Sequence, residues 1–515
     1  MAGLTAGALA IGVARLAAAF ARPETFPVVA VGDAVVDLSP APVKDFAINT
    51  FGENDKTVLV GGVLVVLAGI AALIGVLARR RLGYGYAGLA AFGVIGVLAV
   101  LTRPGAGVGD VLPTVVGVLC GALALTWLLR RATVPEPASS EGGSAQVERP
   151  AVMRAGGEVR GFDRRRLLTG VAGGVVVAGA ATVLGDQFGG RRALDQARVG
   201  LALPKPATPA KPLPPGTDLR INGLSSFITK NQDFYRVDTA LVVPRVDPRD
   251  WKLRIHGMVG KPVELTYSDL LKMPLTEADI TLTCVSNEVG GPYVGNARWL
   301  GVRMADVLRG AGLEPGADML LSTSDDGFTC GTPVDVVMDG RDALFAIAMN
   351  GEPLPLEHGF PVRQVVPGLY GYVSATKWVV DVKVTRFDRD EAYWTPRGWA
   401  AKGPIKTESR IDVPKPGASL KAGRTAIAGV AWAQHVGVDA VEVRVDRGEW
   451  RQARLAAVPG PDTWRQWALD WDATPGDHTI EVRATDASGR TQTDVQAPPA
   501  PDGASGWHTI TVSVA

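Results

Sequence analysis

Cysteine and histidine are scarce in this chain of 515 residues, which contains only three cysteines and five histidines. Three cysteines cannot build a disulfide-supported fold, and they are too few in the polar part to hold an iron–sulfur cluster. No Cys-x-x-Cys-His motif occurs, which excludes covalently attached haem. The histidines all follow the long hydrophobic runs, which excludes a bis-histidine haem within those runs; they stand at positions 256, 358, 435, 478 and 508.

Net charge is also small, because 53 basic residues face 52 acidic ones, and nothing indicates a nucleic-acid partner. The hydrophobic residues concentrate in the first 190 positions. A helix needs roughly 20 apolar residues to cross a bilayer, and five runs approach that length. We predict four transmembrane helices within residues 1–131 and a fifth span within 161–186, with buried helices of a soluble core as the alternative. The runs cover residues 2–20, 57–78, 84–101, 108–129 and 167–185.

Arginine clusters at 79–81 and 130–131 predict which ends of these helices face the cytoplasm. Residues 132–160 are rich in Pro, Ser, Gly and Glu, and predict a flexible cytoplasmic linker. Asp163 and three arginines then precede the fifth run, a pattern typical of a twin-arginine export signal or of an ordinary stop-transfer flank. Either interpretation places the rest of the chain outside the cytoplasmic membrane. The twin-arginine route exports folded proteins, often with a cofactor already inserted.

Three further regions follow the fifth run. Residues 187–218 include a Pro-rich stretch that predicts a semi-rigid spacer. Residues 219–400 alternate short β-rich runs with brief helical patterns, such as 267–272 and 304–310, which predicts an α+β domain. Residues 401–515 contain alternating strands at regular spacing between Gly, Pro and Asp turns, which predicts an immunoglobulin-like β-sandwich.

Cys284 has the surroundings expected of a thiolate that is offered to a metal or a substrate. It follows a β-branched run and precedes a short polar turn and a Gly-Gly pair. Cys120 lies in an apolar run and is most simply a small hydrophobic residue. A second block, from Glu357 to Trp378, carries basic and hydroxyl donors suited to a phosphate or another multi-acceptor anion. A solvated rim with one buried histidine is the alternative for that block.

Several long motifs, in the right order, resemble the molybdopterin-dependent sulfite oxidase family, including its C-terminal dimerisation domain. They are ITLTCVSNE, GNARWLGV, SDDGFT, ALFAIAMNGEPLPLEHGFPVRQVVPGLYGYVSATKWV and the trailing VEVRVDRGEW and HTIEVRATD. The resemblance covers about residues 219–515. It implies a molybdenum–molybdopterin cofactor, without haem or an iron–sulfur cluster, and a homodimer formed through residues 401–515.

The resemblance also implies roles for individual residues. Cys284 stands where the family has the thiolate that binds molybdenum, a soft ligand suited to a metal that also carries two dithiolene sulfurs. Arg236, in Phe-Tyr-Arg-Val-Asp, is the substrate-facing arginine. The residues implied to bind the cofactor are Asn231, Tyr235, Asn287, Asp326, His358, Arg363, Ser374 and Lys377.

Two departures from the family pattern concern the substrate. Glu288 follows Asn287 where sulfite oxidases have arginine, and a carboxylate near an anion site weakens anion binding. Asp238 stands in place of a family histidine. Both changes leave the cofactor residues intact while weakening sulfite as the substrate.

These features predict a multi-pass protein of the cytoplasmic membrane whose catalytic domain faces outward. The expected reaction is a two-electron oxygen-atom transfer on a small oxyanion or S-oxide, with electrons exchanged with a separate partner protein. One rival is a non-catalytic exported binding protein that retains the fold, for which a Cys284–Cys330 disulfide would be evidence. A transporter is the other rival, although the spans carry no charged residue apart from Arg15 and, near one end of a run, Asp110.

Overall fold

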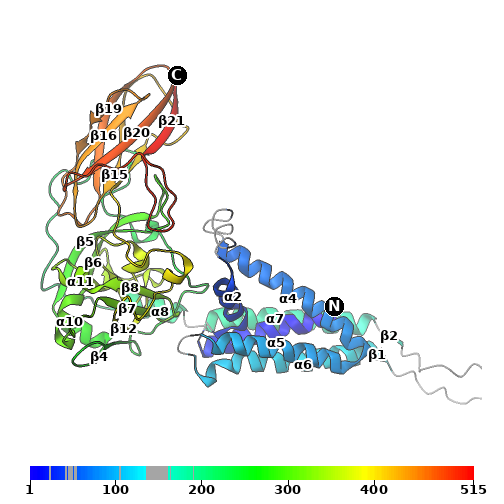
Figure 1. Ribbon diagram of the computed structural model, residues 1–515. Helices are drawn as coiled ribbons and strands as arrows, with labels where there is room; N and C mark the ends of the chain where they lie inside the picture. Colours follow the sequence, from blue (N-terminus) through cyan, green and yellow to red (C-terminus); the bar gives the residue numbers. More distant parts are fainter. Residues whose placement is uncertain are drawn as a thin grey trace, which may run out of the picture. The chain divides into compact units, whose positions relative to one another are not determined.

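The computed structural model describes residues 1–22, 25–40, 43, 50, 55–103, 106–134, 161–162, 164–188 and 191–515. The chain forms two compact units. One unit comprises Met1–Leu194 together with Ala240–Arg245, and the other comprises Asp195–Thr239 together with Val246–Ala515. We call them the helical unit and the β-rich unit (Figure 1).

In the helical unit, small residues allow the helices to pack closely around α1. A Cβ added at Gly3 would lie 2.7 Å from the Cα of Gly75, and one added at Gly117 would lie 2.7 Å from the carbonyl oxygen of Ala10. Such small-residue contacts are the usual way for helices to associate in a bilayer. The helices are α1 (Ala2–Phe20), α2 (Pro27–Leu38), α4 (Asp55–Arg80), α5 (Leu82–Leu101), η3 (Val108–Val111), α6 (Leu112–Ala132), α7 (Arg164–Phe188) and α8 (Arg191–Val199), which continues into the second unit.

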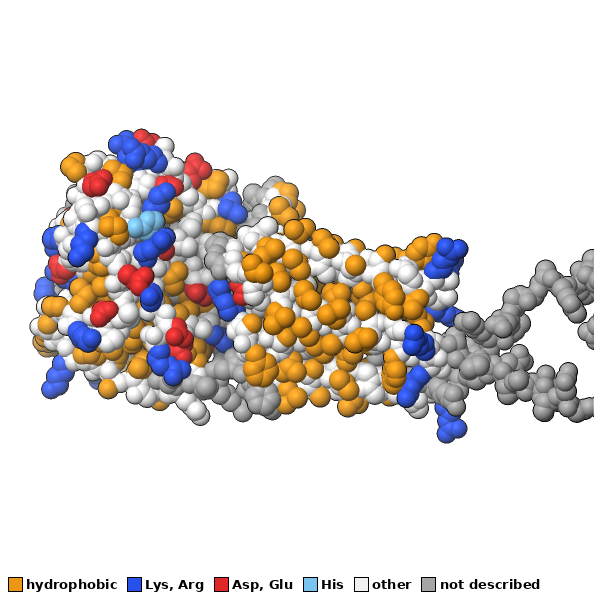
Figure 2. Space-filling view, turned by 90° about the horizontal axis from the view of Figure 1, so that it is seen from below, with side chains coloured by type: hydrophobic (Ala, Val, Ile, Leu, Met, Phe, Trp, Pro, Cys, Tyr) orange, Lys and Arg blue, Asp and Glu red, His pale blue; other side chains and the backbone are white. Residues whose placement is uncertain are grey.

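Five of the described helices are long and apolar enough to cross a membrane, and they match the five predicted runs to within a few residues. Their outward surface is apolar, since Val65, Leu123 and Val176 are each at least 70% exposed. Figure 2 shows this hydrophobic surface, with Lys and Arg side chains at one end of it. Arginines occupy the last turns of α4 and α6, in agreement with the clusters seen in the sequence.

Some expectations for this region differ from the structure or lie beyond it. The helix α2 was not predicted; it is too short to be a span, and its Asp33 forms an ion pair with Arg103. Residues 135–160 of the predicted linker, and Asp163 of the export motif, lie outside the described residues. Short strands β1 (Thr133–Val134) and β2 (Gly161–Phe162) pair with each other at the two ends of that linker.

The first part of the β-rich unit contains two sheets, with strand orders β10-β9-β6-β5, where β11 also pairs with β9, and β4-β3-β12-β7-β8. They share a hydrophobic core that includes Trp251, Phe345 and Val382. The strands are β3 (Lys252–Gly257), β4 (Val263–Thr266), β5 (Leu275–Thr283), β6 (Val294–Arg303), β7 (Met319–Ser324), β8 (Thr329–Pro333), β9 (Leu344–Met349), β10 (Glu352–Pro353), β11 (Arg363–Val365) and β12 (Val379–Thr385).

Short helices connect these strands, so the α+β character expected for residues 219–400 is present. Two of them, α9 and α10, lie where the sequence predicts helices. The set is η4 (Asn231–Asp233), α9 (Tyr267–Lys272), α10 (Met304–Ala311), α11 (Val334–Met338), η5 (Leu356–His358), η6 (Gly371–Val373) and η7 (Thr395–Arg397).

The C-terminal part of the β-rich unit consists of two further sheets, with orders β13-β15-β19-β18 and β14-β21-β20-β16-β17. Ile427 and Trp467 from one sheet share a core with Val441 and Ile480 from the other, so the two sheets form a sandwich. The immunoglobulin-like topology stays a prediction. The strands are β13 (Glu408–Val413), β14 (Ser419–Leu420), β15 (Gly423–Trp432), β16 (Val438–Val445), β17 (Arg451–Gln452), β18 (Arg454–Leu455), β19 (Arg465–Ala473), β20 (Gly476–Asp486) and β21 (His508–Val514).

The Pro-rich segment packs against the β-rich unit instead of standing free as a spacer. The backbone of Thr208 exchanges hydrogen bonds with Leu275 and Glu277, at 3.1 and 2.8 Å. Leu201 and Leu203 pack against the core. The reason for the difference is that β5 offers unpaired backbone groups there, and the two leucines gain by leaving water.

Candidate cofactor and substrate site

Cys284 is the first residue of the loop between β5 and β6, and hydrogen bonds within this loop hold its backbone in place. The backbone N–H of Cys284 donates to the carbonyl of Tyr293 at 3.0 Å, and the N–H of Asn287 donates to the carbonyl of Cys284 at 3.1 Å. The Asn287 side-chain oxygen accepts from the Tyr293 N–H at 2.7 Å. The thiol is therefore held at the end of a buried strand by a loop with few ways to move.

The Cys284 thiol is buried, with its Sγ 3.0 Å from the Ser286 hydroxyl oxygen. Burial raises the pKa of the thiol, while the Ser286 hydrogen bond and the nearby positive charge of Lys377 oppose that effect. No group of three or more Cys, His, Asp or Glu side chains suited to a metal occurs in the described part of the chain. A metal here would therefore find fewer than three such ligands among the described side chains and would need further ligands from a cofactor.

Cys330 provides the contrast to Cys284. It is fully buried on β8, 3.8 Å from the Thr332 hydroxyl, and burial raises the pKa of its thiol to about 11. Both cysteines are free, so the disulfide that would have favoured a non-catalytic protein is not formed.

Arg363, on β11, is a buried cation that has no counter-ion among the described residues. Its guanidinium lies 5.0 Å from the centre of the Trp299 ring, and Nη1 donates to the carbonyl of His358 at 3.2 Å. No described carboxylate forms an ion pair with it, and its Nε has no hydrogen-bond partner among the described residues. Burial lowers its pKa to about 10. An uncompensated buried charge is costly, so this geometry fits a site that receives an anionic group.

His358 supplies a neutral acceptor beside that cation. Its Nε2 lies 3.0 Å from the carbonyl oxygen of Asn231, so Nε2 carries the proton. Burial and the charges of Lys377 and Arg363 lower the pKa of His358 to about 3, which keeps the ring neutral. Its Nδ1 is a buried acceptor with no partner in the described chain. Asn231 is itself held by the side chain of Asn350 at 2.8 Å.

Lys377, Asp238 and Arg236 form a linked ion-pair group. The Lys377 ammonium donates to an Asp238 oxygen at 2.9 Å and to the carbonyl of Glu357 at 3.0 Å. The Nε of Arg236 donates to Asp238 at 2.9 Å. Burial lowers the pKa of Lys377 to about 8, although Asp238 opposes this effect.

The other predicted site residues occupy varied positions. Tyr235 stacks on Phe234 at 5.2 Å, and burial and the charge of Cys284 raise its pKa. Asp326 accepts from the Thr239 hydroxyl at 3.4 Å. The Asn287 side chain is buried and faces the Glu408 carboxyl, whose pKa its hydrogen bond lowers against the effect of burial. The Ser374 hydroxyl donates to backbone carbonyls of Leu369 and Tyr370 at 3.0 Å, so its proton is turned away from a ligand. The cofactor roles of these residues stay predictions.

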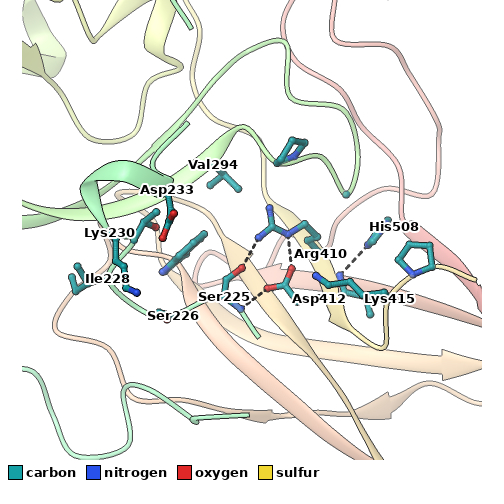
Figure 3. A pocket seen from close by; sticks show the side chains of 16 residues that line it. Ser225, Ser226, Ile228, Lys230, Asp233, Val294, Arg410, Asp412, Lys415 and His508 are labelled. Carbon is teal, nitrogen blue, oxygen red and sulfur yellow. Dashed lines mark hydrogen bonds and ion pairs between the residues drawn. The ribbon is translucent and has the colours of Figure 1, made fainter. Parts of the chain in front are cut away.

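Sequence reasoning missed two buried groups on β13, next to the Cys284 loop. Glu408 is buried, and burial raises its pKa to about 8. Arg410 donates to the carbonyl of Gly291 at 2.8 Å, and it also bonds Asp412 and Ser225 at 2.8 and 3.0 Å. These bonds border a cavity of about 530 Å³ between the two parts of the β-rich unit (Figure 3). The spacing of Glu408 and Arg410 in the sequence does not predict this position, because β13 lies more than a hundred residues after the Cys284 loop and meets it only in the folded chain.

A buried guanidinium without a carboxylate partner among the described residues, a neutral imidazole acceptor and a cysteine thiol therefore lie in one region. Such a set of donors and acceptors suits an anionic ligand that also accepts and donates hydrogen bonds. The donor set fits a molybdopterin, which carries both a phosphate and a hydrogen-bonding ring system.

Comparisons with known proteins agree with this class of site. Residues 240–394 match the model of the oxidoreductase molybdopterin binding domain. The chain is 30% identical over 324 residues to the mitochondrial sulfite oxidase of Rattus norvegicus, covering 53% of this chain and 58% of the rat protein. It is 33% identical over 157 residues to the uncharacterized oxidoreductase YuiH of Bacillus subtilis, covering 30% of this chain and 76% of YuiH.

One solved structure with a partial likeness is the sulfane dehydrogenase SoxCD from Paracoccus pantotrophus. The identity is 26% and the TM-score 0.48, over 55% of this chain and 81% of that chain. The chain belongs to the sulfite oxidase family of molybdopterin-dependent oxidoreductases. It spans less than two thirds of the length of the mammalian sulfite oxidases that it matches.

Proposed function

We propose that this protein is a membrane-anchored molybdenum–molybdopterin oxidoreductase that transfers an oxygen atom to or from a small oxyanion or S-oxide. Arg363 carries this proposal, because a buried guanidinium without a carboxylate partner among the described residues calls for an anionic ligand. Its position beside His358 and close to the Cys284 loop suits a cofactor phosphate and pterin.

Each residue has a proposed task in this reaction. Cys284 would be the protein ligand of molybdenum, whose bound cofactor supplies the two-electron oxygen-transfer chemistry. Arg363 would neutralise the cofactor phosphate, and Asn287 and the neutral His358 would hydrogen-bond the pterin. Arg236, which is 38% exposed, would lie on the substrate side. Asn231, Tyr235, Asp326, Ser374 and Lys377 complete the proposed cofactor set.

We also propose where this chemistry takes place. The five apolar helices support anchoring in the cytoplasmic membrane, and the arginine clusters support an extracytoplasmic β-rich unit. The scarcity of cysteine and histidine supports electron exchange with a separate partner protein. The C-terminal sandwich is proposed to form a homodimer, on the basis of the family resemblance.

Metal and pterin analysis tests the proposal directly. The purified full-length protein is expected to carry about one molybdenum and one pterin per chain, measured by elemental analysis and by fluorescence of the oxidised pterin. Cys284→Ser should abolish turnover and lose most of the metal, whereas Cys330→Ser, the matched control, should keep both. A folded wild-type protein without molybdenum and pterin would instead favour the non-catalytic binding protein.

A further inference from the structure

One carboxylate, Asp238, contacts two cations of the proposed site: Arg236, on the proposed substrate side, and Lys377, in the proposed cofactor set. Its Oδ2 lies 2.9 Å from the Lys377 Nζ and 2.9 Å from the Arg236 Nε, and its Oδ1 lies 3.4 Å from the Arg236 Nη2. The Asp238 side chain is only 6% exposed and that of Lys377 only 9%, so solvent screens the group weakly. Asp238 is therefore part of the site and not a surface charge.

Asp238 occupies one of the edges of Arg236 through which an oxyanion could accept two hydrogen bonds. An arginine grips sulfite, sulfate or phosphate through two parallel N–H donors, and the Nε–Nη2 edge is one of the edges that can do so. Here that edge already donates to the two oxygens of Asp238. An oxyanion would have to displace a bound carboxylate or accept a poorer geometry.

Other charges in the neighbourhood act in the same direction. Burial lowers the pKa of Arg236, but the hydrogen bond and charge of Asp238, together with the charge of Glu357, outweigh it and raise the pKa. Asp238 and Glu357 therefore place negative charge beside Arg236, which is less favourable for a dianion.

We infer that Asp238 sets the charge class of the substrate, so that the site accepts a small uncharged oxygen donor or acceptor and rejects oxyanions. This inference rests on the proposed function and narrows it. Lys377 and Arg236 are positioned by Asp238, which offsets one of their two positive charges before any substrate arrives. An uncharged S-oxide needs only one hydrogen bond to its oxygen, which the remaining Arg236 donors can supply.

The first test compares sulfate binding to Asp238→Asn and wild-type holoenzyme by calorimetric titration at low ionic strength. Removing the carboxylate frees the Arg236 edge, so sulfate affinity is expected to rise by at least about tenfold. The matched control is Asp388→Asn, because Arg386 binds Asp388 through the same Nε and Nη2 atoms at the same sequence spacing, on an exposed turn. Sulfate affinity should not change in this control.

The second test needs only the wild-type holoenzyme, and decides the matter if Asp238→Asn loses its cofactor. With dimethyl sulfoxide as the uncharged probe and a reduced viologen dye as electron donor, kcat/KM should not vary with ionic strength, since a neutral substrate is not steered by charge. The kcat/KM for sulfite oxidation, measured with a dye as electron acceptor, should be at least about tenfold lower than the kcat/KM for dimethyl sulfoxide reduction.

Two results would overturn the inference while leaving the proposed function intact. One is a protein with full molybdenum and pterin that oxidises sulfite faster than it reduces dimethyl sulfoxide. The other is an Asp238→Asn variant, loaded with cofactor, that binds sulfate no more tightly than wild type. Absence of molybdenum and pterin would instead refute the proposed function itself.

Discussion

The helical unit and the β-rich unit differ in where they place large apolar side chains and charged groups. In the helical unit, glycine and alanine bring backbones together, and large apolar side chains point outward. In the β-rich unit, tryptophans such as Trp251 and Trp299 fill the interior, and charged groups are buried beside them. The helical unit is suited to an apolar surrounding, whereas the β-rich unit retains costly buried charges where a ligand can use them.

The strongest way to test this contrast is to remove the buried charge of Arg363. Arg363→Met should reduce retained pterin by at least about tenfold, because the cofactor phosphate loses its cation. The same variant, produced without cofactor, should be more stable than the cofactor-free wild type by about 1–3 kcal/mol, since an uncompensated buried charge is gone. Pterin fluorescence and urea unfolding of the cofactor-free proteins measure the two effects. If cofactor-free Arg363→Met is instead less stable than cofactor-free wild type, the buried charge of Arg363 does not destabilise the fold.

Glu408→Gln tests whether a second buried ionisable group in the β-rich unit lowers its stability, through the dependence of that stability on pH. Glu408 is 3% exposed, and burial raises its pKa to about 8, well above the unfolded value. Between pH 4.5 and 8 the folded state therefore keeps a proton that the unfolded state has released, so stability falls as pH rises. The Gln variant lacks this loss and should be more stable than wild type by about 3 kcal/mol at pH 7.

Thermal or chemical unfolding at several pH values checks this expectation. The advantage of the Gln variant should shrink toward zero near pH 4, where Glu408 is protonated in both states of the wild type. An advantage that stays constant from pH 4 to pH 8 would point to packing and not to ionisation.

The smallest expected effect concerns the helical unit. A Cβ at Gly75 would lie 2.7 Å from the backbone of Gly3, so Gly75→Val must push α4 and α1 apart. We expect a loss of about 1–3 kcal/mol in the stability of the helical unit, measured in detergent. Gly61→Val, where a Cβ meets nothing within 4 Å, is the control. Molybdenum content should be equal in both variants. A loss of molybdenum in Gly75→Val alone would show that helix packing affects cofactor binding, contrary to the expectation that the two units are independent.

Periodicity and local motifs predicted the regular elements well. The helix at Tyr267–Lys272 agrees with the prediction, and the apolar runs coincide with the five long helices, because these patterns depend on neighbours in the chain. The helix α2 was missed since it is half the length of a span, and the Pro-rich segment was misjudged because its partner strand lies far along the chain.

The amino-acid sequence by itself determined the chemical inventory: one cysteine in a held loop, a histidine and an arginine five residues apart, and no haem or iron–sulfur ligand motif. Only the tertiary structure decided which of the basic side chains are neutral and which of them have a carboxylate partner. Among the described residues Arg363 has no carboxylate partner, burial keeps His358 neutral, and Asp238 contacts both Lys377 and Arg236. Burial and long-range ion pairs join residues more than a hundred positions apart, and no local pattern encodes them.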